Sequence, residues 1–431
     1  MGYFDKYHVF RDPIHGFIKV YDLEREIINS KAFQRLRRIR QLGLTNLVYH
    51  GAEHSRFGHS IGVMEIADRI FHVIVAKDHS SNERLLRKEA KWKKGDFDRN
   101  RITLRLVALM HDIGHCPFSH GSEKLFSRGN SHEEMSAKIV ENDPEILQII
   151  NGLRAELEIK NDYIADIIRK KIVPPIISQI ISGPLDADKI DYLWRDSFFA
   201  GVHYGRFDSD RLVNTMTIVF DKVAQEVALG IEEGGYFAAE SLMLARFYMF
   251  MQVYFHEKRR AFDNHLTEFL RTQLPRNIYP NNIKKYLALD DNVVFSWLTK
   301  SGHSKNPSLR DAKAILERNP SRRLAKTSVF AEDKEVEVFK RSFERIRRQF
   351  SGEHIFMDSA NEAPNKFKKE RVYIKRRHTS NMKMIDKYSD IEKISDLIKK
   401  LDDKIQMLRI YVPGENLIEI KKFADKLPWR P

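Results

Sequence analysis

Two histidines and two aspartates, far apart in the chain, have the residue types of a metal site: His59, His111, Asp112 and Asp188. Neutral imidazoles and carboxylates together accept Mn, Mg, Fe, Co, Ni or Zn as a divalent ion. The two carboxylates would cancel the charge of one such ion, which makes a buried site electrostatically acceptable. The ion would leave positions open for a substrate oxygen and for a water whose pKa it lowers. These residues therefore predict one divalent metal ion and hydrolytic chemistry.

The segment around the second histidine supports this prediction. Residues 111–120 (HDIGHCPFSH) place three histidines, an aspartate, a glycine and a proline directly after the apolar run 106–110. An adjacent His-Asp pair is common by chance, and a lone histidine is usually structural. A helix that only packed in the core would not end in so polar a cluster, so we expect this segment to line a functional site.

A second polar segment, residues 186–196 (DADKIDYLWRD), has helical spacing. Side chains three or four residues apart share one face of a helix. One face would carry Asp188, Tyr192, Arg195 and Asp196. With Lys189 beside it, this face suits an anionic ligand that bears hydroxyl groups, such as a nucleotide. The alternative is a solvated charged face, which the aromatic residues of the segment argue against.

Helices must bring these residues together. Hydrophobic periodicity predicts a helix from about Arg56 to Ala76, which carries the first histidine, and another from Ile102 to His111. A third is expected from Gly183-Pro184 to about Phe199, and Gly201 would end it. The other expected elements are a β-hairpin in residues 1–22, a helix through Phe33 and Leu42 capped by Asn29-Ser30, an exposed connection or peripheral helix at 77–101, a helix begun by a Ser131–Glu134 capping box, a hairpin at 218–231 and a long helix at 238–270.

These patterns predict a mostly α-helical protein, with a large helical core, short β-hairpins and a small C-terminal α/β appendage. We expect the core to span residues 1–350, a linker residues 351–370, and the appendage residues 371–431. Within the appendage the pattern indicates a strand at 372–374, a helix at 391–405, a strand at 408–412 and a helix at 417–427. No apolar run reaches the roughly 18 residues that a membrane span needs, and no membrane partner is expected.

The composition limits the class of protein. Of 431 residues, 42% are hydrophobic, which is enough for a large core and excludes wholesale disorder. The only cysteine, Cys116, cannot form an intramolecular disulfide, and the chain shows no signal peptide, so a cytoplasmic setting is the expectation. The net charge of +14 favours polyanionic partners. Charge alone does not choose between nucleotides, nucleic acid and an acidic membrane surface.

Several motifs together resemble the HD-domain phosphohydrolases, and more narrowly the bacterial deoxynucleoside triphosphate triphosphohydrolases that lack a SAM domain. The resemblance rests on residues 9–16 (VFRDPIHG), 33–37 (FQRLR), 41–43 (QLG) and 54–63 (HSRFGHSIGV), and on the two polar segments above. It covers residues 9 to about 258 and, more loosely, the region from about 371. It implies a metal-dependent enzyme that hydrolyses a deoxynucleoside triphosphate (dNTP) to a deoxynucleoside and inorganic triphosphate.

The resemblance assigns roles residue by residue. The metal ligands would be His59, His111, Asp112 and Asp188. The catalytic residues beside the scissile phosphate would be His115, His132 and Glu123, the last of which orients His132. The substrate would contact Gln41, Leu42, Arg56, His120, Lys189, Tyr192, Asp196, Arg246 and Tyr254. An activating nucleotide at a subunit interface would contact Arg11, Asn29, Gln34 and Arg37, and a homodimer or homotetramer is implied.

The chain departs from the family pattern at the activator site. Family members typically have Asn where this chain has Arg11, and an Asp that reads guanine where it has Asn29. The resemblance therefore extends to phosphate binding but not to guanine-specific activation.

Two alternative functions stay open. One is an HD phosphohydrolase for a signalling nucleotide or a nucleoside monophosphate. The other is a nucleic-acid-binding protein or nuclease, which the arginine-rich stretch 35–40 suggests.

Overall fold

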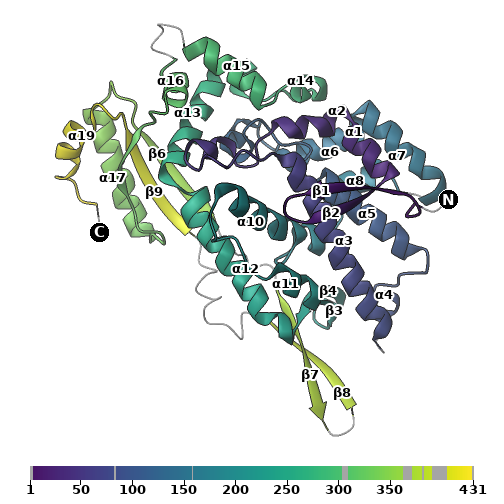
Figure 1. The fold of residues 1–431 in the computed structure, drawn as a ribbon. Helices are drawn as coiled ribbons and strands as arrows, with labels where there is room; N and C mark the ends of the chain where they lie inside the picture. Colours follow the sequence, from purple (N-terminus) through teal and green to yellow (C-terminus); the bar gives the residue numbers. More distant parts are fainter. Residues whose placement is uncertain are drawn as a thin grey trace.

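The computed structural model describes residues 3–81, 84–157, 159–302, 309–362, 371–380, 383–390 and 405–429. The described chain is mostly helical, with short strands gathered in small sheets, and this confirms the predicted fold class (Figure 1). Among these residues, no helix combines the length and the apolar character that crossing a membrane requires.

The chain opens with the predicted β-hairpin, formed by β1 (Tyr7–Asp12) and β2 (Gly16–Tyr21). The strands run antiparallel and are joined by a tight turn. The Asp12 carboxylate accepts the backbone N–H groups of Ile14 and His15, which fixes the turn. The turn is thereby held in one conformation, with polar side chains at defined positions.

The helix predicted through Leu42 is much shorter in the structure. After α1 (Asp22–Asn29), helix α2 (Lys31–Gln34) passes into a 3-10 turn (Arg35–Arg38) and then into extended backbone. The Arg35 side chain is buried and donates to two backbone carbonyls of the core. These tertiary hydrogen bonds hold the segment in a path that a continued helix could not follow.

The long helix α3 (Arg56–Ser80) packs against α5 (Asp96–Met110) and α10 (Ala187–Ala200). All three correspond to predicted helices, although α3 and α5 extend beyond the expected bounds. The connection expected to be exposed contains α4 (Leu85–Lys88), whose two leucines are buried. Gly201, with φ of +69°, ends α10 as predicted. These packed helices form the rigid centre of the molecule.

Four shorter helices cover the same core: α6 (His132–Asn142), α7 (Pro144–Leu157), α8 (Asn161–Ile168) and α9 (Pro175–Ser182). Ser131 caps α6 by accepting the Glu134 N–H, as predicted. The Glu134 carboxylate pairs with Arg169 and does not complete the predicted capping box. The cap still fixes where α6 begins.

The long helix predicted at 238–270 is interrupted. Helix α12 (Tyr236–Met249) passes into a π-helical turn (Phe250–Tyr254), and α13 (Glu257–Gln273) then starts a new helix. Arginine side chains bind the carbonyls freed at the break, so tertiary contacts offset the lost helical hydrogen bonds.

The remaining elements before the C-terminal part are α11 (Ser209–Thr215), the predicted hairpin of β3 (Met216–Asp221) and β4 (Glu226–Glu232), α14 (Ile283–Leu287), α15 (Asp291–Gly302) and α16 (Arg310–Leu316).

A second apolar core lies in the C-terminal part, at the left of Figure 1. Strand β9 (Ile405–Val412) pairs antiparallel with β5 (Arg322–Lys326) and with β6 (Phe356–Glu362). Helices α17 (Asp333–Gln349) and α19 (Leu417–Ala424) contribute apolar side chains to the same core. The expected linker at 351–370 therefore needs correction, because β6 lies inside it and pairs with β9.

The expected appendage at 371–431 is divided between two sheets. Strand β7 (Tyr373–Ser380) pairs parallel with β4 and antiparallel with β8 (Lys383–Asp390), and this ribbon projects from the helical body in Figure 1. The strand predicted at 372–374 thus joins the hairpin sheet, whereas the strand at 408–412 and the helix at 417–427 belong to the second core. Of the helix predicted at 391–405, residues 391–404 lie outside the described residues.

Candidate metal centre

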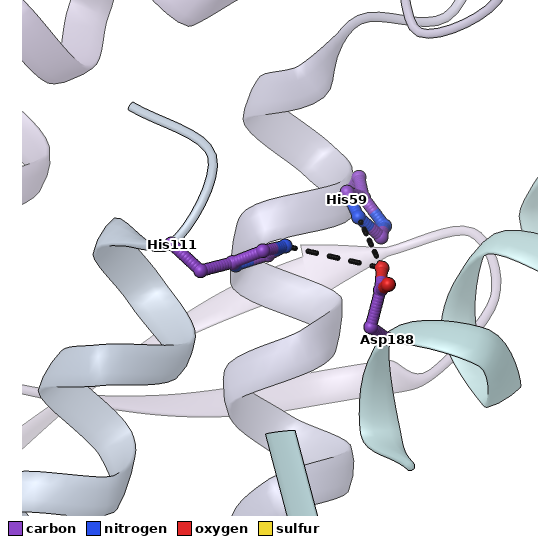
Figure 2. A group of neighbouring side chains, drawn as sticks. All are labelled: His59, His111 and Asp188. Atoms are coloured by element: carbon purple, nitrogen blue, oxygen red, sulfur yellow. Dashed lines mark ion pairs between the residues drawn. The ribbon is translucent and has the colours of Figure 1, made fainter. Parts of the chain in front are cut away.

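The packed central helices bring the four predicted metal ligands together. His59 lies on α3, His111 and Asp112 directly follow α5, and Asp188 lies in the first turn of α10. Figure 2 shows both histidines pointing at Asp188, whose Oδ1 lies 3.1 Å from His59 Nε2 and 3.9 Å from His111 Nε2. The Asp112 carboxylate lies 3.5 Å and 3.4 Å from the same two nitrogens. Such separations suit ligand atoms placed about 2.0–2.2 Å from one shared ion.

The orientation of His111 calls for a cation. Its Nδ1 donates to the Ala108 carbonyl at 2.7 Å, so in the neutral ring the lone pair is on Nε2. This Nε2 is buried and has no hydrogen-bond partner among the described residues, while carboxylate oxygens of Asp112 and Asp188 face it. A lone pair that faces carboxylates is unfavourable unless a cation lies between them. The donor set therefore fits a divalent metal ion.

The charges of the site agree with this assignment. Burial would raise the pKa of Asp112, but the positive charge of Arg56 holds it well below its usual range. The hydrogen bond from His59 likewise outweighs burial and lowers the pKa of Asp188 to about 2. Burial alone would lower the pKa of His59, yet hydrogen bonds to Asp188 and Asp191 raise it to about 10. Without a metal ion, a proton on His59 supplies positive charge that the metal would replace.

A group of acid-base residues lies beside the metal ligands. The rings of His115 and His132 stack with centroids 4.1 Å apart. Glu123 contacts Nδ1 of His132 with one oxygen and Nδ1 of His120, at 2.7 Å, with the other. Burial would lower the pKa of His132, but the hydrogen bond and the charge of Glu123 outweigh it and raise the pKa. Burial and the charge of Arg56 hold the pKa of His115 well below its usual range, so the two stacked imidazoles have pKa values shifted in opposite directions.

Two groups of predicted substrate residues have fixed positions near this centre. Arg56 donates to Asp112 at 2.5 Å, which holds its guanidinium against the metal ligands. On α10 and the π-helical turn, the Tyr254 hydroxyl donates to Asp196 at 2.8 Å, and the rings of Tyr192 and Tyr254 pack edge to face. These groups can present positive charge and hydroxyl-binding oxygens to a ligand.

For four other predicted substrate residues, the structure gives burial or hydrogen bonding but, among the residues it describes, no side-chain hydrogen bond to the metal ligands. Gln41 and Leu42 are buried, and the Gln41 side-chain oxygen lacks a hydrogen-bond partner within the described chain. The Arg246 guanidinium also has a buried nitrogen, Nε, that is unsatisfied by any described residue. Lys189 is engaged elsewhere, since its Nζ binds the Asp186 carboxylate and a backbone carbonyl. These two contacts use two of the three N–H donors of the ammonium group.

Two of the four predicted activator residues line one cavity of the described chain. A cavity of about 400 Å³ is lined by Arg11 and Arg37 but not by Asn29 or Gln34. Gln34 instead supports Arg37 by accepting a hydrogen bond from its Nε at 2.9 Å. The remaining lining residues are Phe10, Asp12, Pro13, Glu53, His54, Ser55, Phe57, Gly58, Ile61, Arg195 and Phe199.

The predicted ligand-binding face of α10 needs one correction. Arg195 is buried and binds Asp191 and Asp12, so it does not face the substrate region with its neighbours. Sequence reasoning also missed Asp191, whose carboxylate lies 2.8 Å from His59 Nδ1. A signal was present, because Asp191 follows Asp188 by three residues and precedes Arg195 by four, which is the spacing of helical neighbours.

Comparison with known proteins agrees with this geometry. Residues 56–195 match the HD domain, and residues 207–427, about half of the chain, match the HD associated region. An uncharacterized protein of Bacillus subtilis, YwfO, is 34% identical over 66% of this chain. The human deoxynucleoside triphosphate triphosphohydrolase SAMHD1 is 28% identical over 75% of it. The chain spans 64% of the length of the first relative and 55% of the second.

Solved structures extend the similarity over nearly the whole chain. A hypothetical protein from Aquifex aeolicus has a TM-score of 0.75 and 29% identity, and the match covers 97% of this chain and 99% of that one. A phosphohydrolase from Bacteroides thetaiotaomicron has a TM-score of 0.72 and 25% identity, with coverage of 94% and 100%. With its HD domain, its HD associated region and the converging histidines and aspartates, the chain belongs to the HD-domain phosphohydrolase superfamily.

Proposed function

We propose that this protein is a metal-dependent dNTP triphosphohydrolase, which converts a dNTP and water to a deoxynucleoside and inorganic triphosphate. The observation that carries the proposal is the buried His111 Nε2, a lone pair facing two carboxylates at the meeting point of three helices. The similarity to SAMHD1 supports the substrate class. The cationic and hydroxyl-binding groups around the centre suit a triphosphate attached to a sugar.

The metal ion would be held by His59, His111, Asp112 and Asp188. When bound, a divalent ion polarises a phosphate oxygen and lowers the pKa of a water. The reaction forms a bond from the water oxygen to the α-phosphorus and breaks the bond from that phosphorus to the 5′ oxygen of the sugar. The leaving 5′ oxygen must gain a proton as this bond breaks.

His132 is suited to supply that proton. Glu123 binds its Nδ1, which orients the ring, and it raises the pKa of His132, which favours the protonated form. His115 stacks on the same ring and keeps it in place. In this proposal His132 is the general acid, Glu123 orients it, and His115 supports it and contacts a phosphate oxygen.

The remaining roles concern binding. The positive charges proposed to neutralise the triphosphate are Arg56, His120, Lys189 and Arg246, because charge spread over phosphate oxygens needs several cationic donors. The residues proposed to contact the sugar and base are Gln41, Leu42, Tyr192, Asp196 and Tyr254. A buried, closely packed sugar site of this kind would discriminate against a 2′ hydroxyl.

We also propose that the arginine-lined cavity binds an activating nucleotide and that the protein acts as a homodimer or homotetramer. Arg11 and Arg37 would bind phosphate there, with Gln34 supporting Arg37. Asn29 would lie at the edge of the bound nucleotide. The helical core and the C-terminal α/β part would act as separate units of the fold.

The test is a substrate panel. Purified full-length protein is incubated with each dNTP and with Mn, Mg, Fe, Co, Ni or Zn, with and without a second nucleotide. We expect equal amounts of deoxynucleoside and triphosphate, and loss of at least a thousandfold in rate in His111→Ala, a change of the order seen when a catalytic centre is dismantled. Release of phosphate or pyrophosphate alone would contradict the proposed reaction. Activity only on signalling nucleotides or nucleoside monophosphates would favour that alternative.

A further inference from the structure

The metal ligand His59 is held by a buried network that the proposed roles do not use. Asp191, on α10, is fully buried, and its oxygens lie 2.8 Å from His59 Nδ1 and 2.6 Å from His15 Nε2. Arg195, one turn further along the helix, contacts both oxygens at 2.9 Å. The same guanidinium binds Asp12, at 2.9 Å. Donors from α3, α10 and the hairpin turn therefore fix the Asp191 carboxylate.

Two glycines of helix α3, Gly58 and Gly62, face the side chains of this network. A Cβ atom at Gly62 would lie 1.9 Å from Asp191 Oδ1 and 2.5 Å from Arg195 Nη2, closer than any side chain allows. A Cβ at Gly58 would lie 3.2 Å from Arg195 Nη1. Glycine next to the His59 turn thus lets the carboxylate and the guanidinium approach the helix backbone. The close approach of α10 to α3 depends on this missing side chain.

The charges of the network match one divalent cation when the histidines are neutral. Four carboxylates lie around the centre: Asp12, Asp112, Asp188 and Asp191. Two guanidinium groups, Arg56 and Arg195, oppose them. With neutral histidines, two negative charges remain, which is the complement of one divalent ion. Buried charges that lack partners are costly, so the network and the ion stabilise each other.

We propose that Asp191 is a positioning residue for the metal. It accepts the Nδ1 proton of His59, which directs the Nε2 lone pair at the ion and raises the basicity of the ring. Asp12 and His15 make the N-terminal hairpin turn part of this support. The inference rests on the metal site of the proposed function, but it concerns metal affinity and is independent of the substrate.

The experiment measures Mn²⁺ binding to the full chain by electron paramagnetic resonance, with circular dichroism as the check on folding. In Asp191→Asn we expect affinity to fall about 10–100-fold, the usual cost of losing such a partner. The matched control is Asp68→Asn, which also removes a buried carboxylate of the core but one bound to Arg101 and Arg105 and to no metal ligand. Its affinity should change by less than about twofold, because distant sites act independently.

A second variant removes no polar group. Gly62→Ala must displace the Asp191 carboxylate, so we expect it to weaken Mn²⁺ binding, whereas Gly152→Ala, with open space around its Cβ, should not. If Asp191→Asn does not fold, the comparison of Gly62→Ala with Gly152→Ala tests whether the position of Asp191 affects metal affinity. Wild-type affinity in folded Asp191→Asn or Gly62→Ala, or an equal loss in the controls, would overturn the proposal. Wild-type protein that binds Mn²⁺ but hydrolyses no dNTP would contradict only the proposed function.

Discussion

At the scale of single residues, the centre is organised by one repeated arrangement. In three histidines an acceptor binds Nδ1: the Ala108 carbonyl in His111, Asp191 in His59 and Glu123 in His132. An acceptor on Nδ1 fixes the tautomer, so that Nε2 is directed at the functional space. Two of these nitrogens face the metal position, and the third, on His132, lies beside it. The acceptors therefore orient the three imidazoles, and the position of each Nε2 relative to Asp112 and Asp188 distinguishes the candidate metal ligands from His132.

The prediction at this scale concerns Glu123→Gln. The charge of Glu123 raises the pKa of His132, so the variant should lose the protonated imidazole at a lower pH than wild type. We expect kcat to fall by about 10²–10⁴-fold and its alkaline limb to move to lower pH. The control is Glu141→Gln, on the helix α6 that begins at His132, because this change removes a carboxylate partner of Arg169 and none of His132. An unshifted pH profile would exclude this role for Glu123.

At the scale of elements, helix α10 connects the candidate metal centre to the proposed substrate region. Asp188 and Asp191 of this helix contact His59 at the candidate metal centre. Tyr192 and Asp196 of the same helix contact Tyr254, a residue proposed to bind the substrate. Arg195 ties the same helix to the hairpin turn. Because a helix moves as a rigid unit, these contacts keep a fixed geometry relative to one another.

A second cluster at this scale, His265, Asp311 and His354, joins α13, α16 and the loop before β6. Its residues lie within the reach of one ion, but both ring nitrogens of His265 are already used. Nδ1 faces Asp311 at 2.6 Å, and Nε2 accepts the Ser321 N–H at 3.0 Å. An Nε2 that accepts a hydrogen bond requires the proton on Nδ1, so this histidine is structural.

This cluster predicts an acid-sensitive contribution to stability. Burial, with the charge of Arg310, lowers the pKa of His354 from 6.5 to about 4. As pH falls from 6.5 to about 4, the unfolded chain binds a proton on His354 that the folded chain does not, so stability decreases over this window. In His354→Gln we expect a smaller fall of Tm between pH 7 and about 4.5, measured by calorimetry. An equal fall in both proteins would show that His354 does not contribute.

At the scale of the whole molecule, the metal site joins three helices that are distant in the chain. A ligand that binds only the folded state stabilises it by mass action. The second core lies apart from these helices in Figure 1. Metal binding should therefore stabilise the helical core first.

The matching prediction is a shift of thermal stability. Mn²⁺ at a hundred times its dissociation constant should add about 2.7 kcal/mol, which raises Tm by several degrees in a protein of this size. A chelator should reverse the shift, and His111→Ala should abolish it. Differential scanning calorimetry measures both. A shift of the same size in His111→Ala would place metal binding elsewhere.

Local patterns were enough to predict much of this protein. Periodicity and caps involve neighbouring residues, so helices α3, α5 and α10, the two hairpins and the ends at Ser131 and Gly201 follow from short stretches of sequence. Three of the four candidate ligands stood out for the same reason, since His111, Asp112 and Asp188 lie in the short polar segments 111–120 and 186–196. Long-range contacts had no such signature. Packing shortened the predicted helix after Ser30 and interrupted the one at 238–270.

Asp191 shows why local sequence predicted some features of the site and long-range contacts decided others. Residues 186–196 contain four aspartates, and their spacing alone does not tell which one meets the metal and which one meets a histidine of α3. That choice depends on the gap at Gly62, on Arg195 and on a hairpin turn more than a hundred residues earlier. Residue types and local spacing thus defined the chemistry, whereas the packing of distant segments selected the partner of each group.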